Sequence, residues 1–293
     1  MLIFIIMSLD AVKILEISIT KNSKNEILEF IRNGFATEAE KSDKRGKNPQ
    51  KIGKILTIVT PNPEQIVYAR HDKHFREIIN QADVAIPDGI GVVWAIKFLH
   101  LLPAVYHPQP TVTTIPGIEF MENLILEATK QRVPIALIGG RGGLALKTLE
   151  CLQKTHQKLV GWAIDGPEMR IENFELRMKY ENAENYFQEL AKRIVETKTR
   201  MVFVGLGAPK QEYFIEKLSR ELSLVHYQLP TLCMSVGGSF DEIAGRIPRA
   251  PVWVNRFGMK WLWRLVLEPW RIKRQLALIK FVWLVVLERY KMI

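Results

Sequence analysis

A hydroxyl, an amide and a carboxylate stand in two turns that each follow an apolar run. Thr60 and Asn62 lie in TPNPE at the end of residues 55–60, and Asp88 lies in PDG after residues 84–86. Both runs predict strands, and the carboxyl ends of parallel strands meet at one sheet edge, where open α/β proteins bind ligands. A carboxylate in such a crevice can act as a general base toward a hydroxyl.

Three glycine-rich turns follow other predicted strands and supply backbone amides. They read GGRGG from residue 139, GLGAPKQ from residue 205 and GGSFD from residue 237. Amides at a helix N-terminus bind phosphate groups. One such turn is typical of a tight strand–helix connection, whereas two on one edge, with GGSFD beside them, indicate a phosphate-bearing ligand. The candidate contacts are Gly139, Gly140, Gly205, Gly207 and Lys210.

Each of these polar side chains also has a purely structural interpretation. An Asp before Gly in a Pro-Asp-Gly turn commonly caps backbone amides. Thr60 and Asn62 can cap the following helix, and Lys210 can be a solvated charge. The six histidines lack zinc-type spacing, and the chain contains no GxGxxG, Walker A or GxSxG motif. The sequence leaves the structural and the chemical interpretation of Asp88, Thr60 and Asn62 open.

Apolar runs alternate with helical patterns along most of the chain. Strands are expected at residues 12–19, 55–60, 84–86, 134–138, 159–164, 201–204 and 232–236. Helices are expected at residues 25–33, 63–81, 91–101, 118–130, 144–156 and 173–197, with one more after residue 210. This alternation predicts an α/β fold, with a Rossmann-like, mostly parallel sheet flanked by helices and right-handed crossovers.

Composition divides the chain into three segments. A hydrophobic content of 47% with 25% charged residues is ordinary for a soluble globular protein. Residues 246–293 contain eleven Lys or Arg against two Glu, which is nearly all of the net charge of +10, and five of the seven Trp. We expect an entry segment at 1–50, ending in a polar loop at 38–50, a core at 51–245 and a basic, Trp-rich helical appendage at 246–293.

Tryptophan mixed with basic residues favours the headgroup region of an anionic membrane, so we expect the appendage to lie on such a surface. If it were one helix, Arg264 and Arg271 would lie within about 20° of each other and Arg274 about 80° away, on one basic face. Pro269 breaks or kinks a helix, so two helices meeting there are equally consistent. The apolar residues 276–287 fall short of the roughly 20 residues that span a bilayer.

The opening MLIFIIM lacks the basic region and the small-residue cleavage site of a signal peptide. We therefore predict no signal peptide and a cytoplasmic protein. We also expect the core at 51–245 to fold without the appendage.

The blocks TPNPE, PDGIGVVWA, LIGGRGG, VGLGAPKQE, VGGSFDEIAGRIPRAP and WLWRLVLEPWRIKR follow one another over about residues 55–274. In this order they resemble the WecG/TagA/CpsF glycosyltransferases, glycosyltransferase family 26. The resemblance implies transfer of an N-acetylmannosamine-type sugar, or a related hexose, from a UDP-sugar to a polyprenyl-diphosphate-linked saccharide. It also implies inversion at the anomeric centre, no metal or other cofactor, and peripheral association with the inner face of the plasma membrane.

The resemblance assigns roles to single residues. Asp88 matches the family's candidate base. Pocket and appendage positions match Thr60, Asn62, Gln211, Arg264, Arg271 and Arg274. One position departs from the family pattern, because this chain has Thr113 and Thr114 where many members have an arginine before the Pro-Gly turn. That departure leaves the identity of the sugar open.

Two other classes of protein share parts of these patterns. A dinucleotide-dependent oxidoreductase uses glycine turns, but the acidic residue expected at the end of a following strand is missing. A nucleic-acid-binding protein uses basic, aromatic segments, with an affinity that falls steeply with salt. We expect no nucleic-acid partner. A homo-oligomer is compatible with the sequence.

Overall fold

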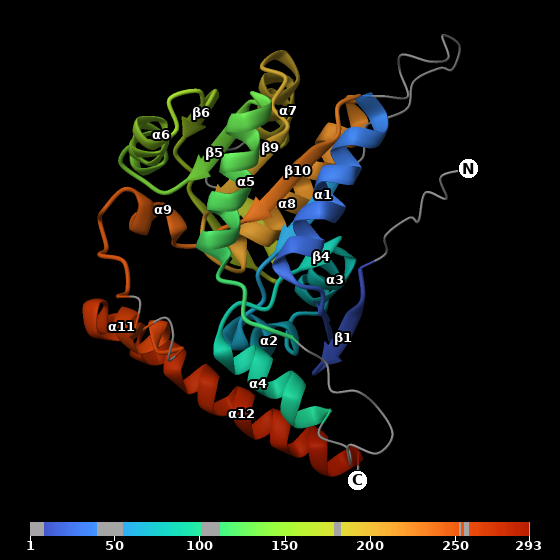
Figure 1. Ribbon diagram of the computed structural model, residues 1–293. Helices are drawn as coiled ribbons and strands as arrows, with labels where there is room; N and C mark the ends of the chain where they lie inside the picture. The colour runs from blue at the N-terminus through green and yellow to red at the C-terminus, as the bar shows by residue number, and fades with distance from the viewer. Residues whose placement is uncertain are drawn as a thin grey trace.

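The computed structural model describes residues 9–39, 55–100, 112–178, 183–251, 253–254 and 258–292. Its central sheet has six parallel strands in the order β4-β3-β10-β9-β5-β6 (Figure 1). The strands are β3 (Ile55–Val59), β4 (Val84–Ala85), β5 (Ile135–Gly139), β6 (Gly161–Ile164), β9 (Met201–Gly205) and β10 (Thr231–Ser235). The predicted α/β fold with a parallel sheet is confirmed.

Helices cover both faces of the sheet. One face carries α2 (Pro63–Ala69), α3 (Lys73–Gln81), α4 (Ile90–Leu99), α7 (Ala183–Glu196), α8 (Lys210–Leu224) and α12 (Ile272–Met292). The other carries α1 (Lys24–Ala39), α5 (Gly117–Gln131), α6 (Leu144–Thr155) and α9 (Ser239–Ile243). Along β9, Val202 and Val204 face the first layer, whereas Met201 and Phe203 face the second. Because both faces are buried, the strands are continuous apolar runs.

The connections diverge between β5 and β9. Strand β5 leads through α6 to β6 at one edge of the sheet, whereas β9 leads through α8 to β10 in the opposite direction. A crevice forms at the carboxyl ends of two strands whose connections diverge in this way. Gly139 and Gly205 pair in register at those two ends. The fold therefore places the predicted glycine turns at the expected position of a ligand site.

Two predictions near the N-terminal half were wrong in detail. The strand expected at 12–19 is a hairpin of β1 (Ala11–Ile14) and β2 (Ile17–Thr20), which turns at Leu15 and Glu16 with φ of 47° and 69°. The helix expected at 63–81 is broken into α2 and α3. Asp72 ends the continuity because its carboxylate caps α3, accepting the Phe75 backbone N–H at 2.9 Å.

The prediction of a helix at 173–197 placed its start too early. Residues before it form a second hairpin, β7 (Met169–Glu172) and β8 (Glu175–Met178), and the helix starts at Ala183. The turn lies at Asn173 and Phe174, which both have positive φ. The polar loop expected at 38–50 lies almost entirely outside the described residues, and the apolar opening at 1–7 lies outside them completely.

The described residues from 260 to 292 form two helices rather than one. Helix α11 (Lys260–Leu267) ends before the 3-10 turn Pro269–Arg271, and α12 follows directly. Figure 1 shows α12 running along α2 and α4, whereas α11 lies beyond them. Across the parts of the chain that the structure describes, no helix is both long enough and apolar enough to cross a bilayer.

Candidate active site

Asp88 lies where two turns and one helix end meet. Its backbone N–H donates to the Pro61 carbonyl at 3.2 Å, which ties the turn after β4 to the turn after β3. The backbone N–H of Gly117, the first residue of α5, lies near enough to its carboxylate to influence its pKa. A Cβ at Gly117 would lie 3.2 Å from Thr60 Cγ2, so Thr60 borders the same point. The structure thus brings the predicted Thr60 and Asp88 together.

The surroundings of Asp88 favour a proton acceptor. Burial raises the pKa of its carboxyl above the ordinary value, and Glu242 acts in the same direction. Lys260 and the Gly117 N–H oppose this shift. The residue nevertheless keeps a partly exposed surface. A carboxylate with a raised pKa is suited to take a proton from a bound hydroxyl.

Asn62 has the structural role that the sequence left open. Its Oδ1 accepts the Gln65 backbone N–H at 3.0 Å, and Gln65 Oε1 accepts the Asn62 backbone N–H at 3.1 Å. This capping box starts α2 and fixes the turn that carries Thr60. Asn62 therefore shapes the candidate site through the backbone.

Gln211 is buried between two turns of the sheet edge. Its Oε1 accepts the Gly237 backbone N–H at 2.9 Å, and its Nε2 donates to Glu212 Oε1 at 2.8 Å. It joins the start of α8 to the turn after β10. The predicted pocket glutamine thus lies at the sheet edge, with both ends of its amide engaged.

The glycines at the ends of β5 and β9 are required by close backbone packing. A Cβ on Gly139 would lie 2.4 Å from the Gly205 carbonyl oxygen, and a Cβ on Gly205 would lie 2.7 Å from the Phe240 ring. The Gly143 N–H at the start of α6 donates to Asp165 Oδ2 at 2.8 Å. These glycines have a packing role whether or not a ligand binds.

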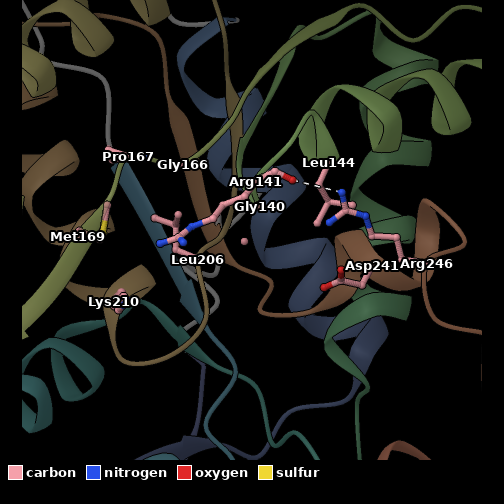
Figure 2. Close-up of a pocket in the computed structure, with 11 residues that line it drawn as sticks. Gly140, Arg141, Leu144, Gly166, Pro167, Met169, Leu206, Lys210, Asp241 and Arg246 are labelled. Atoms are coloured by element: carbon pink, nitrogen blue, oxygen red, sulfur yellow. Dashed lines mark hydrogen bonds between the residues drawn. The ribbon is translucent and has the colours of Figure 1, made fainter. Parts of the chain in front are cut away.

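A cavity of about 250 Å³ opens beside these glycines, at the point where the connections diverge. Figure 2 shows its polar lining, which includes Arg141, Lys210, Asp241 and Arg246. Arg246 donates to the Arg141 carbonyl at 3.2 Å, which fixes one side of the cavity. Burial raises the pKa of Asp241, although Arg264 and Arg246 oppose the shift. The lining combines three cations with one carboxylate.

The predicted glycine contacts divide at this cavity. Gly140 and Gly205 belong to its lining, as does Lys210. Gly139 is packed behind them, and Gly207, with a φ of 75°, turns the chain ahead of α8. A nucleotide phosphate at this place would face Gly140, Gly205 and three cationic side chains.

Comparison with known families decides the class of this protein. The model of the glycosyl transferase WecG/TagA/CpsF family matches residues 12–292. The chain belongs to this family. It is therefore a glycosyltransferase of cell-envelope polysaccharide biosynthesis.

The appendage arginines of this WecG/TagA/CpsF family member are held by carboxylates. Arg264 donates to Glu268 Oε2 at 2.6 Å and to Glu242 Oε1 at 3.1 Å. Arg271 pairs with Glu268 Oε2 at 2.8 Å. Arg264 also lies over the Gly238 turn, 3.1 Å from the position of a Cβ there. The structure thus places Arg264 at the sheet edge, whereas the Arg274 side chain lies outside the described residues.

Several site residues were missed from the sequence. Asp241 and Arg246 lie in the GGSFDEIAGR block, so the block itself was the available signal. Lys260, which pairs with Glu242 Oε2 at 3.1 Å and acts on Asp88, had no signal beyond its charge. Thr113 and Thr114 are exposed beside Ile115, whose N–H donates to the Pro87 carbonyl at 3.1 Å. The Ile115–Pro87 hydrogen bond therefore connects the segment that departs from the family pattern to the turn that carries Asp88.

The described residues contain no group of three or more His, Cys, Asp or Glu side chains placed to hold a metal ion.

Proposed function

We propose that this glycosyltransferase moves an N-acetylmannosamine-type sugar, or a related hexose, from a UDP-sugar to a polyprenyl-diphosphate-linked saccharide. The transfer inverts the anomeric centre and uses no metal, with Asp88 as the general base. The observation that carries the proposal is the position of Asp88. Its buried carboxylate lies at the N-terminus of α5, on the same sheet edge as the cationic cavity.

The proposed step needs one base and one stabilised leaving group. Asp88 takes the proton from the acceptor hydroxyl while the oxygen attacks the anomeric carbon. The bond between that carbon and the diphosphate breaks on the opposite face, which inverts the centre, and UDP leaves with the bonding electrons. A positioned carboxylate of this kind contributes about 10²- to 10⁴-fold to the rate.

The cavity suits the UDP portion of the donor. Lys210, Arg141 and Arg246 line it and can stabilise the charge that develops on the departing diphosphate. Asp241 offers carboxylate oxygens to hydroxyl groups, as acidic residues do for ribose in other nucleotide sites. The cavity lies at the carboxyl ends of β5 and β9, whereas Asp88 comes after β4, and β3 and β10 lie between β4 and β9 in the sheet. A donor of several linked groups can extend along this edge, with its sugar toward Asp88.

The appendage suits an anionic membrane surface at the inner face of the plasma membrane. Its helices expose large apolar side chains among their basic residues, and such mixtures bind lipid headgroups. Half or more of the surface of each of these side chains is exposed: Val266, Trp270, Ile272, Leu276, Ile279, Trp283 and Tyr290. A lipid-linked acceptor would be met on the same surface.

The test measures UDP release in EDTA from a panel of UDP-sugars with a polyprenyl-diphosphate-linked acceptor analogue. We compare wild type with Asp88→Asn and, as a matched control, with Asp10→Asn, whose carboxylate pairs with Lys21 at the surface. We expect turnover by wild type and the control, and a loss of about 10²- to 10⁴-fold in kcat for Asp88→Asn. Wild-type kcat should fall on acidification at a pH above the ordinary pKa of Asp, because burial raises the pKa of Asp88.

Two results would contradict the proposal. Full activity of Asp88→Asn would leave the enzyme class unchanged and reduce Asp88 to a turn residue. Activity that is lost in EDTA and restored by adding divalent metal back would contradict the metal-independent mechanism.

A further inference from the structure

A buried carboxylate connects three turns of the candidate site. Glu212, the third residue of α8, is 1% exposed. Its Oε1 accepts two side-chain amide donors, Gln65 Nε2 at 3.2 Å and Gln211 Nε2 at 2.8 Å. Gln65 belongs to α2, which follows β3, so a single oxygen joins two helices that begin at different strand ends.

Each glutamine carries the connection further. Gln65 forms the capping box with Asn62 and so fixes the turn that bears Thr60. Gln211 accepts the Gly237 N–H and so fixes the turn over which Arg264 lies. The turns after β3, β9 and β10 are therefore linked through Glu212.

Glu212 also determines which way the amides point. Both glutamines accept a backbone N–H through Oε1, so their Nε2 groups must find an acceptor inside the protein. Without that acceptor, two buried donors would be left unsatisfied, and an amide flip would break the backbone contacts instead. The acceptor is provided by Glu212 alone among the described residues that these two Nε2 groups contact.

We propose that Glu212 is a positioning residue for the sugar transfer: it sets the turns of Thr60 and Gly237 relative to each other, and works through Gln65 and Gln211. The proposal rests on the function proposed above. Glu212 itself contacts no reacting group, so its effect falls on the geometry of the bound state. Small displacements of positioning groups reduce rates strongly.

The protonation of this carboxyl bears on the same connection. Burial raises the pKa of Glu212 to about 7, whereas Gln211, its own backbone and Ser235 act in the opposite direction. No charged side chain contributes. The titratable groups on elements near Glu212 have partners of their own: His74 of α3 pairs with Glu216, and Asp72 accepts the Tyr213 hydroxyl.

Two buried oxygens lie beside each other at the other side of this carboxyl. Glu212 Oε2 and Ser235 Oγ both lack a hydrogen-bond partner within the described chain. Ser235 is near enough to Glu212 to influence its pKa but lies outside hydrogen-bond geometry. A proton on Oε2 can be shared with the Ser235 hydroxyl after a small rotation, while Oε1 continues to accept both amides.

The sign of the effect on stability follows from these values. The pKa of Glu212 is about 7 in the folded chain against an ordinary 4.5, so the folded chain holds an extra proton between them. Its contribution to stability is full below 4.5 and is lost as the pH rises through 7. A glutamine at this position keeps the carbonyl acceptor and cannot ionise.

The experiment compares wild type, Glu212→Gln, Glu212→Leu and the control Glu216→Gln, an exposed position on the same helix. Tm is measured without substrate from pH 5 to 8.5, and kcat and KM are measured per folded enzyme. We expect Glu212→Gln to keep kcat within about threefold, since its carbonyl accepts both amides. The Tm of Glu212→Gln minus that of wild type should be larger at pH 8.5 than at pH 5, by about 2 °C or more. Glu212→Leu should lose about 10- to 100-fold in kcat.

The outcomes separate a positioning role from a merely structural one. A Glu212→Leu enzyme that has a lower Tm but wild-type kcat and KM would overturn the proposal, as would parallel Tm profiles for wild type and Glu212→Gln. If wild type releases no UDP from any donor, the proposed function fails instead. The side-chain amide NMR signals of Gln65 and Gln211 then decide on Glu212. They should shift together in Glu212→Leu, and unchanged signals would overturn the connection.

Discussion

The two helices of the appendage are attached to the core by different forces. No residue of α11 is buried, and charge pairs connect it to α9, because Arg264 and Lys260 pair with Glu242. In α12, Phe281 and Val285 are completely buried in the hydrophobic core on the α2 and α4 side. The partly exposed Lys260–Glu242 pair is sensitive to salt, whereas buried apolar side chains are not. Helix α11 is thus the less firmly attached of the two.

This difference bears on the expectation that residues 51–245 fold without the appendage, which stays a prediction. Removing residues after 245 would expose the apolar surface that α12 covers on the α2 and α4 side of the core. We therefore regard α12 as part of the folded core. The element that can respond to a membrane or a substrate is α11 with the turn that follows it.

The largest expected effect is on α12. Phe281→Ala should lower the free energy of unfolding by about 3–5 kcal/mol, because it removes a ring from a fully buried position and leaves a cavity. The measurement is urea denaturation, with Trp283→Ala as the control, since that side chain is 59% exposed on the same helix. Equal stability of the two variants would show that α12 is not part of the core.

A smaller effect is expected on α11. Glu242→Gln keeps a carbonyl acceptor but removes the charge that pairs with Lys260 and Arg264, and should lower the free energy of unfolding by about 1–2 kcal/mol, between the values for exposed and buried pairs. Proteolysis between α9 and α11 should become faster, and the same change should appear in wild type in 1 M NaCl, where the Debye length is about 3 Å. Glu196→Gln, which loses only a surface pair with Lys192, is the control. A variant as resistant to protease as wild type would mean that other contacts hold α11.

The smallest effect on stability belongs to the exposed aromatic surface between the helices. Trp270→Ala should change the free energy of unfolding by less than about 0.5 kcal/mol, because the side chain is 71% exposed. Binding to vesicles that contain anionic lipid should nevertheless weaken by about tenfold if the ring inserts. Leu224→Ala, on the distant end of α8, should leave vesicle binding unchanged. Equal binding by both variants would place the membrane contact elsewhere.

Much of the fold and part of the site followed from local patterns. The apolar runs located all six strands of the sheet within about two residues, because strands that are buried on both faces have continuous apolar sequences. The hairpins at 11–20 and 169–178 were missed because their turns use Leu15, Glu16, Asn173 and Phe174, three of which are not typical turn residues. The break at Asp72 was missed because an Asp in a helical pattern reveals its capping role only through its contacts.

The sequence by itself determined where the crevice lies. Alternating strands and helices, with polar or glycine-rich turns at strand ends, place Thr60, Asp88 and the glycine turns on one edge whatever the details of packing. Tertiary structure decided what each side chain does there. Only the fold brings Glu242 to Arg264, Glu212 to Gln65 and Phe281 into the core. The reason is physical: the partner of a charge, an amide or an apolar face is chosen by residues distant in the chain, and local spacing carries no information about them.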